Sequence, residues 1–188
     1  MEKNPHHLIM GELTDFLSGE PRADTHDERY RQKLARLLVQ DLGYDPKQIQ
    51  QNRGVIIRNQ GQSARIIVDF LVSVDSGVFM LIKYAPGSLV TRRLSNLALS
   101  RIIFSYQIPV VVTTNGEDAE VFSGRTGKVM GQGLSAIPSR KDALTQTELA
   151  ASSPIGQDLF EKATKIAYAC EVDGACPCDT GVCLMDED

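Results

Sequence analysis

The first third of the chain has the apolar spacing of helices. Apolar residues in the opening segment recur every three or four positions until Gly19, which predicts an accessory helix within residues 1–24. A second apolar stripe with the same period begins after Thr25, a suitable N-cap, and ends at Leu42. Gly43 then favours the left-handed backbone that closes a helix. We therefore expect two helices before the first strand.

The next segments have the pattern of strands. Short stretches rich in β-branched residues cover 54–58, 65–74 and 78–84, and the turn sequences Asn59–Gly61 and Asp75–Gly77 separate them. Three strands in succession, joined by tight turns, predict an antiparallel meander. The third strand is apolar on both faces, which is typical of a strand in the centre of a sheet.

Helix and strand patterns alternate in the rest of the chain. We expect a helix over 88–106, a buried strand over 108–114, a hairpin over 119–130 and a last helix over 156–169. A short helix is also expected to start near Ser139. The order of these elements predicts an α/β fold in which helices flank a central sheet.

Charge is unevenly distributed along the 188 residues, whose net charge is -4. The last nineteen residues contain six acids and no Lys or Arg, whereas residues 51–141 contain eleven bases and five acids. The basic segment 51–141 is compatible with nucleic-acid binding although the net charge of the chain is negative. The alternative is an ordinary solvated surface, which can have the same composition. No apolar run is long enough to cross a membrane, and the first residues do not resemble a signal peptide. We expect a soluble, cytoplasmic protein without a membrane partner, and a homo-oligomer stays open.

Two charged residues within the predicted strands are the first candidates for chemistry. Asp69 lies among apolar neighbours, and Lys83 lies near the end of the following strand. On adjacent antiparallel strands the two can meet at one end of the sheet, where an Asp can bind a divalent cation and a Lys can orient water or stabilise a phosphate. The alternative is a cross-strand ion pair without a catalytic role.

Four stretches of sequence, in order, resemble one known family. Asp69 and the segment Leu81–Gly87, together with the opening helix, the strand at 108–114 and the following hairpin, are similar to the PD-(D/E)xK nuclease superfamily. The closer resemblance is to the N-terminal nuclease domain of type I restriction enzyme R subunits, over residues 25–141. It implies a restriction-endonuclease-like core, a mixed central sheet flanked by helices, and the apolar pattern adds accessory helices at both ends. We therefore expect four segments: an accessory segment 1–24, the nuclease-like domain 25–141, a helical extension 142–169 and an acidic, Cys-rich tail 170–188.

The resemblance also implies a site that cleaves DNA with Mg²⁺. The family's helix acid, strand Asp and Lys correspond to Glu28, Asp69 and Lys83, so that Asp69 and Glu28 would bind the metal. Leu81 stands where the family has a Glu, and Leu cannot bind a cation. The family also tends to carry a Gln on the helix that follows, where this chain has Asn96 and Ser100 and no Gln. We therefore expect a DNA-interacting domain with a weak or inactive site, and the alternative is an active Mg²⁺-dependent endonuclease.

Arginines and cysteines complete the set of candidates. A phosphate track is expected to consist of Arg58, Arg65, Arg92, Arg93 and Arg101. The chain also has four cysteines, all near its end: Cys170, Cys176, Cys178 and Cys183. Four thiolates at this spacing can surround Zn²⁺, which would make the tail the functional part of a metal- or redox-responsive protein. The alternative is an acidic tail with free thiols.

Overall fold

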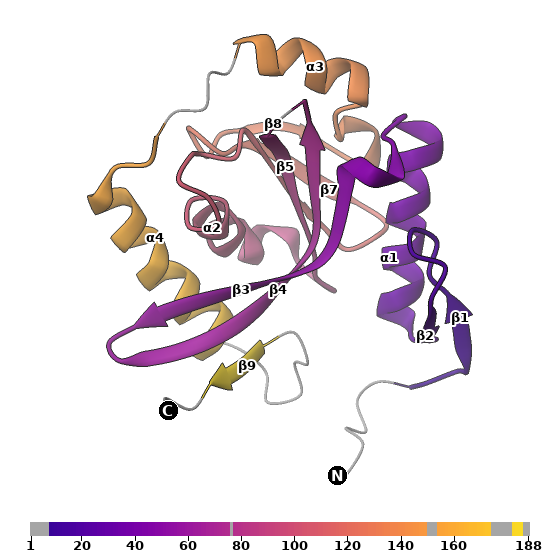
Figure 1. The fold of residues 1–188 in the computed structure, drawn as a ribbon, viewed down its shortest axis with the longest axis horizontal. Coiled ribbons are helices and arrows are strands. Elements are labelled where there is room, and N and C mark those ends of the chain that lie inside the picture. The colour runs from indigo at the N-terminus through magenta and orange to yellow at the C-terminus, as the bar shows by residue number, and fades with distance from the viewer. Residues whose placement is uncertain (1–7, 76, 150–153, 174–181, 186–188) are drawn as a thin grey trace.

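A computed structural model describes residues 8–75, 77–149, 154–173 and 182–185 (Figure 1). Its main strands are β3 (Ile49–Asn59), β4 (Gln62–Val74), β5 (Gly77–Tyr84), β6 (Val110–Thr114), β7 (Ala119–Ser123), β8 (Val129–Gln132) and β9 (Val182–Met185). They form a seven-stranded sheet in the order β3-β4-β5-β6-β7-β8, with β9 paired to β4 outside this path. Only β5 and β6 are parallel among these pairs of described strands. The sheet is therefore mixed.

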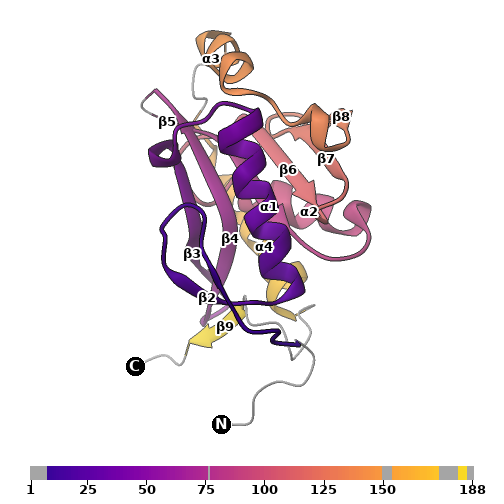
Figure 2. The ribbon, with the colours of Figure 1, turned by 90° about the vertical axis from the view of Figure 1, so that its right-hand side faces the viewer.

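Helices cover both faces of this sheet. The helical elements are α1 (His26–Arg36), η1 (Leu37–Asp41), η2 (Pro46–Gln48), α2 (Leu89–Leu99), η3 (Leu134–Ala136), α3 (Arg140–Leu149), α4 (Gln157–Tyr168) and η4 (Ala169–Asp173). Figure 2 shows α1 crossing one face, while α2 and α4 lie on the other. Within the described residues, no helix has the length and apolar character needed to span a bilayer. The expected α/β core is confirmed.

Alternation along the strands divides the apolar core into two layers. Phe70 and Ile82 pack with Leu34 on the α1 side of the sheet. Leu71 and Leu81 pack with α2 and α4 on the other side. Successive residues of a strand point to opposite faces, so a strand buried on both faces is apolar at nearly every position. This explains the uninterrupted apolar runs of β4 and β5.

Two local predictions, a helix cap and a hairpin turn, are confirmed. Thr25 caps α1, because its hydroxyl oxygen accepts from the N–H of Glu28 at 3.1 Å. The turn between β3 and β4 has positive φ at Gln60 (52°) and Gly61 (80°), as hairpins that match the twist of their strands require. The antiparallel meander β3-β4-β5 follows from this turn and the next.

The predicted N-terminal helix is wrong. The chain forms a two-stranded hairpin instead, from β1 (Glu12–Thr14) and β2 (Pro21–Ala23). The Asp15 carboxylate accepts from the backbone N–H of Ser18 at 2.7 Å and closes the turn, and this local bond competes with a helix. Leu8 is 69% exposed, so part of the apolar spacing does not form a buried face.

Two further expectations need correction. The helix α2 ends at Leu99 rather than continuing to Tyr106, because the N–H groups of Arg101 and Ile102 turn back to carbonyls three residues earlier. The C-terminal residues, expected to form only a tail, contribute η4 and the strand β9 to the body of the fold. The expected helix near residues 156–169 is confirmed as α4.

Candidate functional site: a fork between two strands

The candidate site lies where β4 and β5 separate. The two strands are paired from Val74–Gly77 up to Phe70–Ile82, and no further. The strand β9 pairs with residues 63–66 of β4, on the edge of β4 that β5 also uses. Residues 67–69 of β4 therefore lie between two partner strands. We call the fork the set of residues 67–69 of β4 and 83–84 of β5.

Asp69 lies in the fork with both carboxylate oxygens bonded. Its Oδ1 accepts from Arg31 Nε on α1 at 2.6 Å, and its Oδ2 accepts from the backbone N–H of Tyr84 at 2.8 Å. The side chain is buried, at 3% exposure for the residue. The Asp69–Tyr84 bond connects β4 to β5 at a position where the backbone ladder has ended. The carboxylate is thus a structural bridge as well as one partner of an ion pair.

Lys83 makes the second bridge across the fork. Its Nζ donates to the backbone carbonyl of Ile67 at 3.0 Å and lies 3.0 Å from Oε2 of Glu171 in η4. The other oxygen of Glu171 accepts from the Ser95 hydroxyl of α2 at 2.6 Å. Glu171 is 5% exposed. The ammonium group therefore has a buried counter-ion from the C-terminal part of the chain.

Glu28 belongs to a network on the α1 side of the fork. Its Oε1 accepts from Gln32 Nε2 at 2.8 Å, and its Oε2 lies 3.8 Å from Arg31 Nη1. Gln32 also donates to Asp15, which forms an ion pair with Arg22 at 2.8 Å. Burial raises the pKa of Asp15, but hydrogen bonds from Gln51, Ser18 and Gln32 outweigh it and bring the pKa below its usual range. The hairpin β1–β2 is thereby connected to the first turns of α1.

The oxygens around the fork do not fit a Mg²⁺ ion. Such an ion needs octahedral oxygen ligands, usually with carboxylates that are free to coordinate it. Asp69 is bonded to Arg31, Leu81 is fully buried in the α2–α4 core, and Glu28 faces two guanidinium groups. Among the described residues, no group of three His, Cys, Asp or Glu side chains could hold a metal. One oxygen of Asp69 already has a cationic partner, and the other accepts a backbone hydrogen bond.

Polar residues continue across the sheet on the α2 side. Cross-strand partners on β5, β6, β7 and β8 form a row of Lys83, Thr113, Glu120 and Gln132. Arg93 of α2 forms a bidentate pair with Glu120, with its shortest bond at 2.7 Å. Asn96 donates to the Thr113 hydroxyl at 2.8 Å. These α2 side chains therefore satisfy buried polar groups of the sheet.

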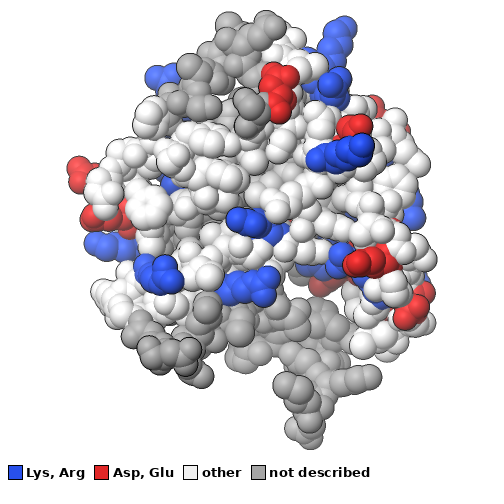
Figure 3. Space-filling view, in the orientation of Figure 1, with Lys and Arg blue, Asp and Glu red and all other residues white. Residues whose placement is uncertain are grey.

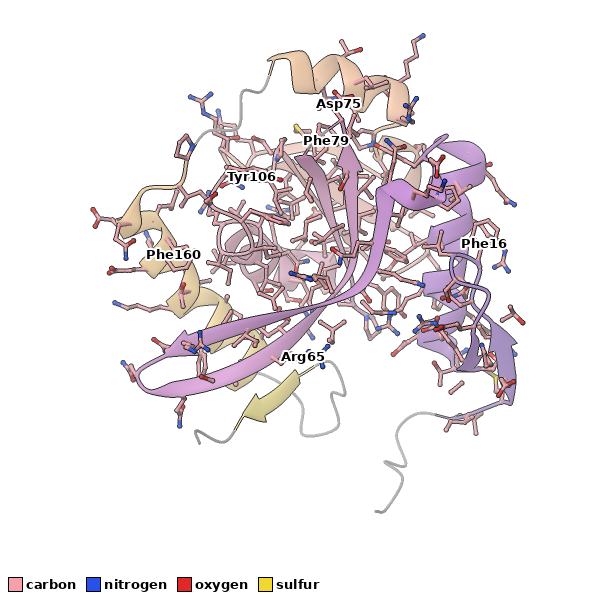
Figure 4. All side chains as sticks on the ribbon, viewed as in Figure 1. Phe16, Arg65, Asp75, Phe79, Tyr106 and Phe160 are labelled. Carbon is pink, nitrogen blue, oxygen red and sulfur yellow. The ribbon has the colours of Figure 1, made fainter. Side chains whose placement is uncertain are left out.

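Two of the predicted DNA-binding arginines project from the β3–β4 ribbon. Arg58 and Arg65 are both exposed, and no ion pair of either is found within the described residues. Arg65 lies opposite Ile56, so it shares a face with Arg58 on a diagonal of about 7 Å. Its guanidinium lies across Gly54, where a Cβ would clash with it. Figure 3 shows basic side chains over this ribbon, and Figure 4 labels Arg65 beside β9.

The other three predicted arginines have different surroundings. Arg93 is bonded to Glu120, and Arg101 donates to Gln107 and to the carbonyl of Gly124 at 3.3 Å each. Burial lowers the pKa of Arg101. Arg92 is half-buried near Cys170. The structure thus places Arg58 and Arg65 on one face of the ribbon and directs Arg93 and Arg101 toward internal partners.

Most of the predicted zinc site lies outside the described residues. Cys176 and Cys178 lie outside the described residues, and only the backbone of Cys183 is described. Cys170 is half-buried in η4, where burial and then the nearby Glu171 raise the pKa of its thiol. Zinc binding stays a prediction.

Sequence reasoning missed the partners of Asp69 and Lys83. Arg31 follows the predicted acid Glu28 by three residues, so both lie on one face of α1, and this spacing could have indicated it. Glu171 is one of six acids in the C-terminal segment, and nothing in its spacing distinguishes it from the others. Ser95 is one of several polar residues of α2, and nothing in its spacing distinguishes it from the others.

The architecture is that of a restriction-endonuclease-like domain: a mixed sheet flanked by helices, with an Asp and a Lys where two strands separate. The family model described as type I restriction enzyme R protein N terminus matches residues 26–138, so the chain belongs to this family. No curated protein and no solved structure matches the chain. The match ends before α3, α4, η4 and β9.

The Arg31–Asp69 pair can be tested by its effect on stability. Arg31→Met leaves a buried carboxylate without its counter-ion, and we expect it to lower the free energy of unfolding by about 3 kcal/mol. Adding Asp69→Asn should recover a large part of this loss, because the amide needs no cation. Urea denaturation of the two single variants and the double variant gives the coupling energy.

Lys33→Met is the matched control, because Lys33 is exposed on the same helix. It should change stability by less than about 0.5 kcal/mol. Additive effects of Arg31→Met and Asp69→Asn would show that the two side chains do not depend on each other.

Proposed function

We propose that this chain is a restriction-endonuclease-like, DNA-interacting domain whose catalytic site is weak or inactive. The observation that carries the proposal is the Arg31–Asp69 ion pair of 2.6 Å in the fork. The family membership supports the restriction-modification context. We place the protein in the cytoplasm, where such a domain meets DNA.

The case for weak catalysis rests on the charges in the fork. Metal-dependent cleavage of a phosphodiester needs a cation that binds both the enzyme and the phosphate, and a nucleophilic water beside it. Asp69 has a cationic partner on the chain itself, and Lys83 has an anionic one in Glu171. Position 81, where the family has an acid, is a leucine with no exposed surface. A cation would therefore have to displace Arg31 and bind with few oxygens.

The case for DNA binding rests on the β3–β4 ribbon. Guanidinium groups contact phosphates well, and neutralising them releases counter-ions from the DNA. Arg65 precedes Ile67 of the fork by two residues, about 7 Å along the strand. A DNA backbone that contacts Arg58 and Arg65 would thus run toward the fork. Arg92, Arg93 and Arg101 are weaker candidates, because two of them have internal partners.

The alternative of an active endonuclease depends on the same residues. In that case Arg31 would leave Asp69 when DNA and Mg²⁺ arrive, and Asp69 with Lys83 would act at the scissile phosphate. The cysteine tail remains a separate hypothesis, in which Zn²⁺ binding is the function of the C-terminal residues.

The inactive site predicts the outcome of a cleavage assay. Purified protein incubated with supercoiled plasmid and Mg²⁺ or Mn²⁺ should produce no more nicked DNA than the Asp69→Ala and Lys83→Ala variants. Gel quantification of nicked and linear forms is the measurement. Metal-dependent cleavage that both substitutions abolish would establish the active nuclease instead.

The ribbon predicts the salt dependence of binding. Replacing Arg58 and Arg65 together by Glu should weaken binding of a duplex oligonucleotide and lower the slope of log K against log salt by about two, near 0.9 for each lost phosphate contact. Fluorescence anisotropy at several salt concentrations measures both quantities.

Arg125→Glu with Lys128→Glu is the matched control, because it makes the same change in charge at exposed positions of the β7–β8 turn. An equal loss in this control would mean that only net charge matters. An absence of binding at low salt that no substitution in the chain relieves would rule out the DNA-interacting function.

A further inference from the structure

Glu171 is held like a bound oxyanion. Each of its two oxygens has a donor of its own, the Lys83 ammonium at 3.0 Å and the Ser95 hydroxyl at 2.6 Å. Arg92 lies near enough to influence the neighbouring Cys170 electrostatically. These donors are chemically suited to any anion with two adjacent oxygens, including the non-bridging oxygens of a phosphate.

The two donors to Glu171 belong to the family domain, but Glu171 does not. Lys83 and Ser95 lie within the matched residues 26–138, on β5 and α2. Glu171 comes from η4, more than thirty residues after the match ends. The C-terminal part of the chain thus supplies the anion that Lys83 and Ser95 of the domain bind.

The same part of the chain contacts β4 on the other side of the fork. The strand β9 pairs with residues 63–66 of β4, and its Cys183 lies opposite Arg65. The Lys83 bond to the carbonyl of Ile67 lies directly beyond this pairing. The strand β9 therefore lies beside Arg65 on β4, whereas η4 lies on the α2–α4 side of the sheet, where Val172 packs against the core layer.

A buried ion pair is weak evidence for a purely stabilising role. Two apolar side chains of similar size are often as stable or more stable, because burying both charges costs solvation. A carboxylate at this position is explained if another anion can take the place of Glu171. The incoming anion would then accept the same bonds from Lys83 and Ser95.

We propose that Lys83 and Ser95 form a binding site for a DNA phosphate, and that Glu171 occupies this site as an internal competitor. This inference rests on the proposed DNA-interacting function and adds a regulation to it. When DNA binds, its phosphate replaces the Glu171 carboxylate and η4 moves away from the fork. The contact of Glu171 with Lys83 and Ser95 thus lowers the affinity of the chain for DNA.

Glu171→Gln in the full chain tests this directly. The variant keeps the size of the side chain and removes its charge, so duplex DNA should bind roughly tenfold more tightly, the effect of one charge-assisted hydrogen bond. The slope of log K against log salt should increase by about one. The double variant Lys83→Gln, Glu171→Gln should lose this gain, because the ammonium that meets the phosphate is absent.

Glu161→Gln is the matched control. Glu161 is exposed on α4 and bonded to Gln157, so its substitution makes the same change in net charge away from the fork. If Glu171→Gln binds DNA no more tightly than Glu161→Gln, the competitor is ruled out. Wild-type binding that needs Arg58 and Arg65 would still support the proposed function in that case. No binding by any variant would overturn both.

Hydrogen exchange of the wild-type protein gives a second readout that does not depend on a substitution. Saturating duplex DNA should speed exchange of the η4 amides at residues 169–173, because the helical turn leaves its site. Unchanged or slower exchange there, in a complex shown to be formed by anisotropy, would contradict the displacement of Glu171.

Discussion

The β4–β5 ladder ends at Phe70–Ile82, and the backbone N–H and carbonyl groups beyond this point need other partners. The structure around the fork depends on how these groups are satisfied. A buried backbone N–H or carbonyl without a partner is costly, so a sheet that splits must satisfy these groups in another way. Asp69 accepts from the N–H of Tyr84, and Lys83 donates to the carbonyl of Ile67. The two charged side chains thus replace the missing rungs of the β4–β5 ladder. Any change of either residue is expected to affect the sheet as well as the chemistry.

This double bridge requires charge compensation from both faces of the sheet. Helix α1 brings Arg31 to Asp69 on one face, and η4 brings Glu171 to Lys83 on the other. The two partners lie in opposite directions along the chain, one near the start of the domain and one after its end. The fork therefore connects the N-terminal helix, the sheet and the C-terminal elements. Under the proposed function, these internal ion pairs stand where a cation and a substrate phosphate would bind.

Much of the fold was predictable because it depends on local patterns. The meander, the cap at Thr25 and the helix α4 follow from turn residues, capping residues and apolar period. The N-terminal hairpin was not predictable from apolar spacing, because the side-chain bonds of Asp15 decide that segment. The end of α2 at Leu99 and the pairing of β9 with β4 depend on tertiary contacts.

The candidate site was predictable in its residues but not in their partners. Asp69 and Lys83 are conspicuous because charges are rare in buried strands. Glu171 lies 88 positions after Lys83, and no sequence pattern connects the two. Whether a site binds a metal depends on such partners, since a carboxylate that already has a guanidinium is a different ligand from a free one.

The central claim is that Arg31 occupies the position at Asp69 that a catalytic metal would take. Titrating Mn²⁺ into ¹⁵N-labelled protein tests it, because a bound paramagnetic ion broadens the signals of nearby amides. The amide of Tyr84, bonded to Asp69, is the most direct reporter. The account predicts that this signal keeps its line width in the wild-type protein at millimolar Mn²⁺. Selective broadening of the Tyr84 signal, absent in Asp69→Asn, would show a metal at the fork and contradict the account.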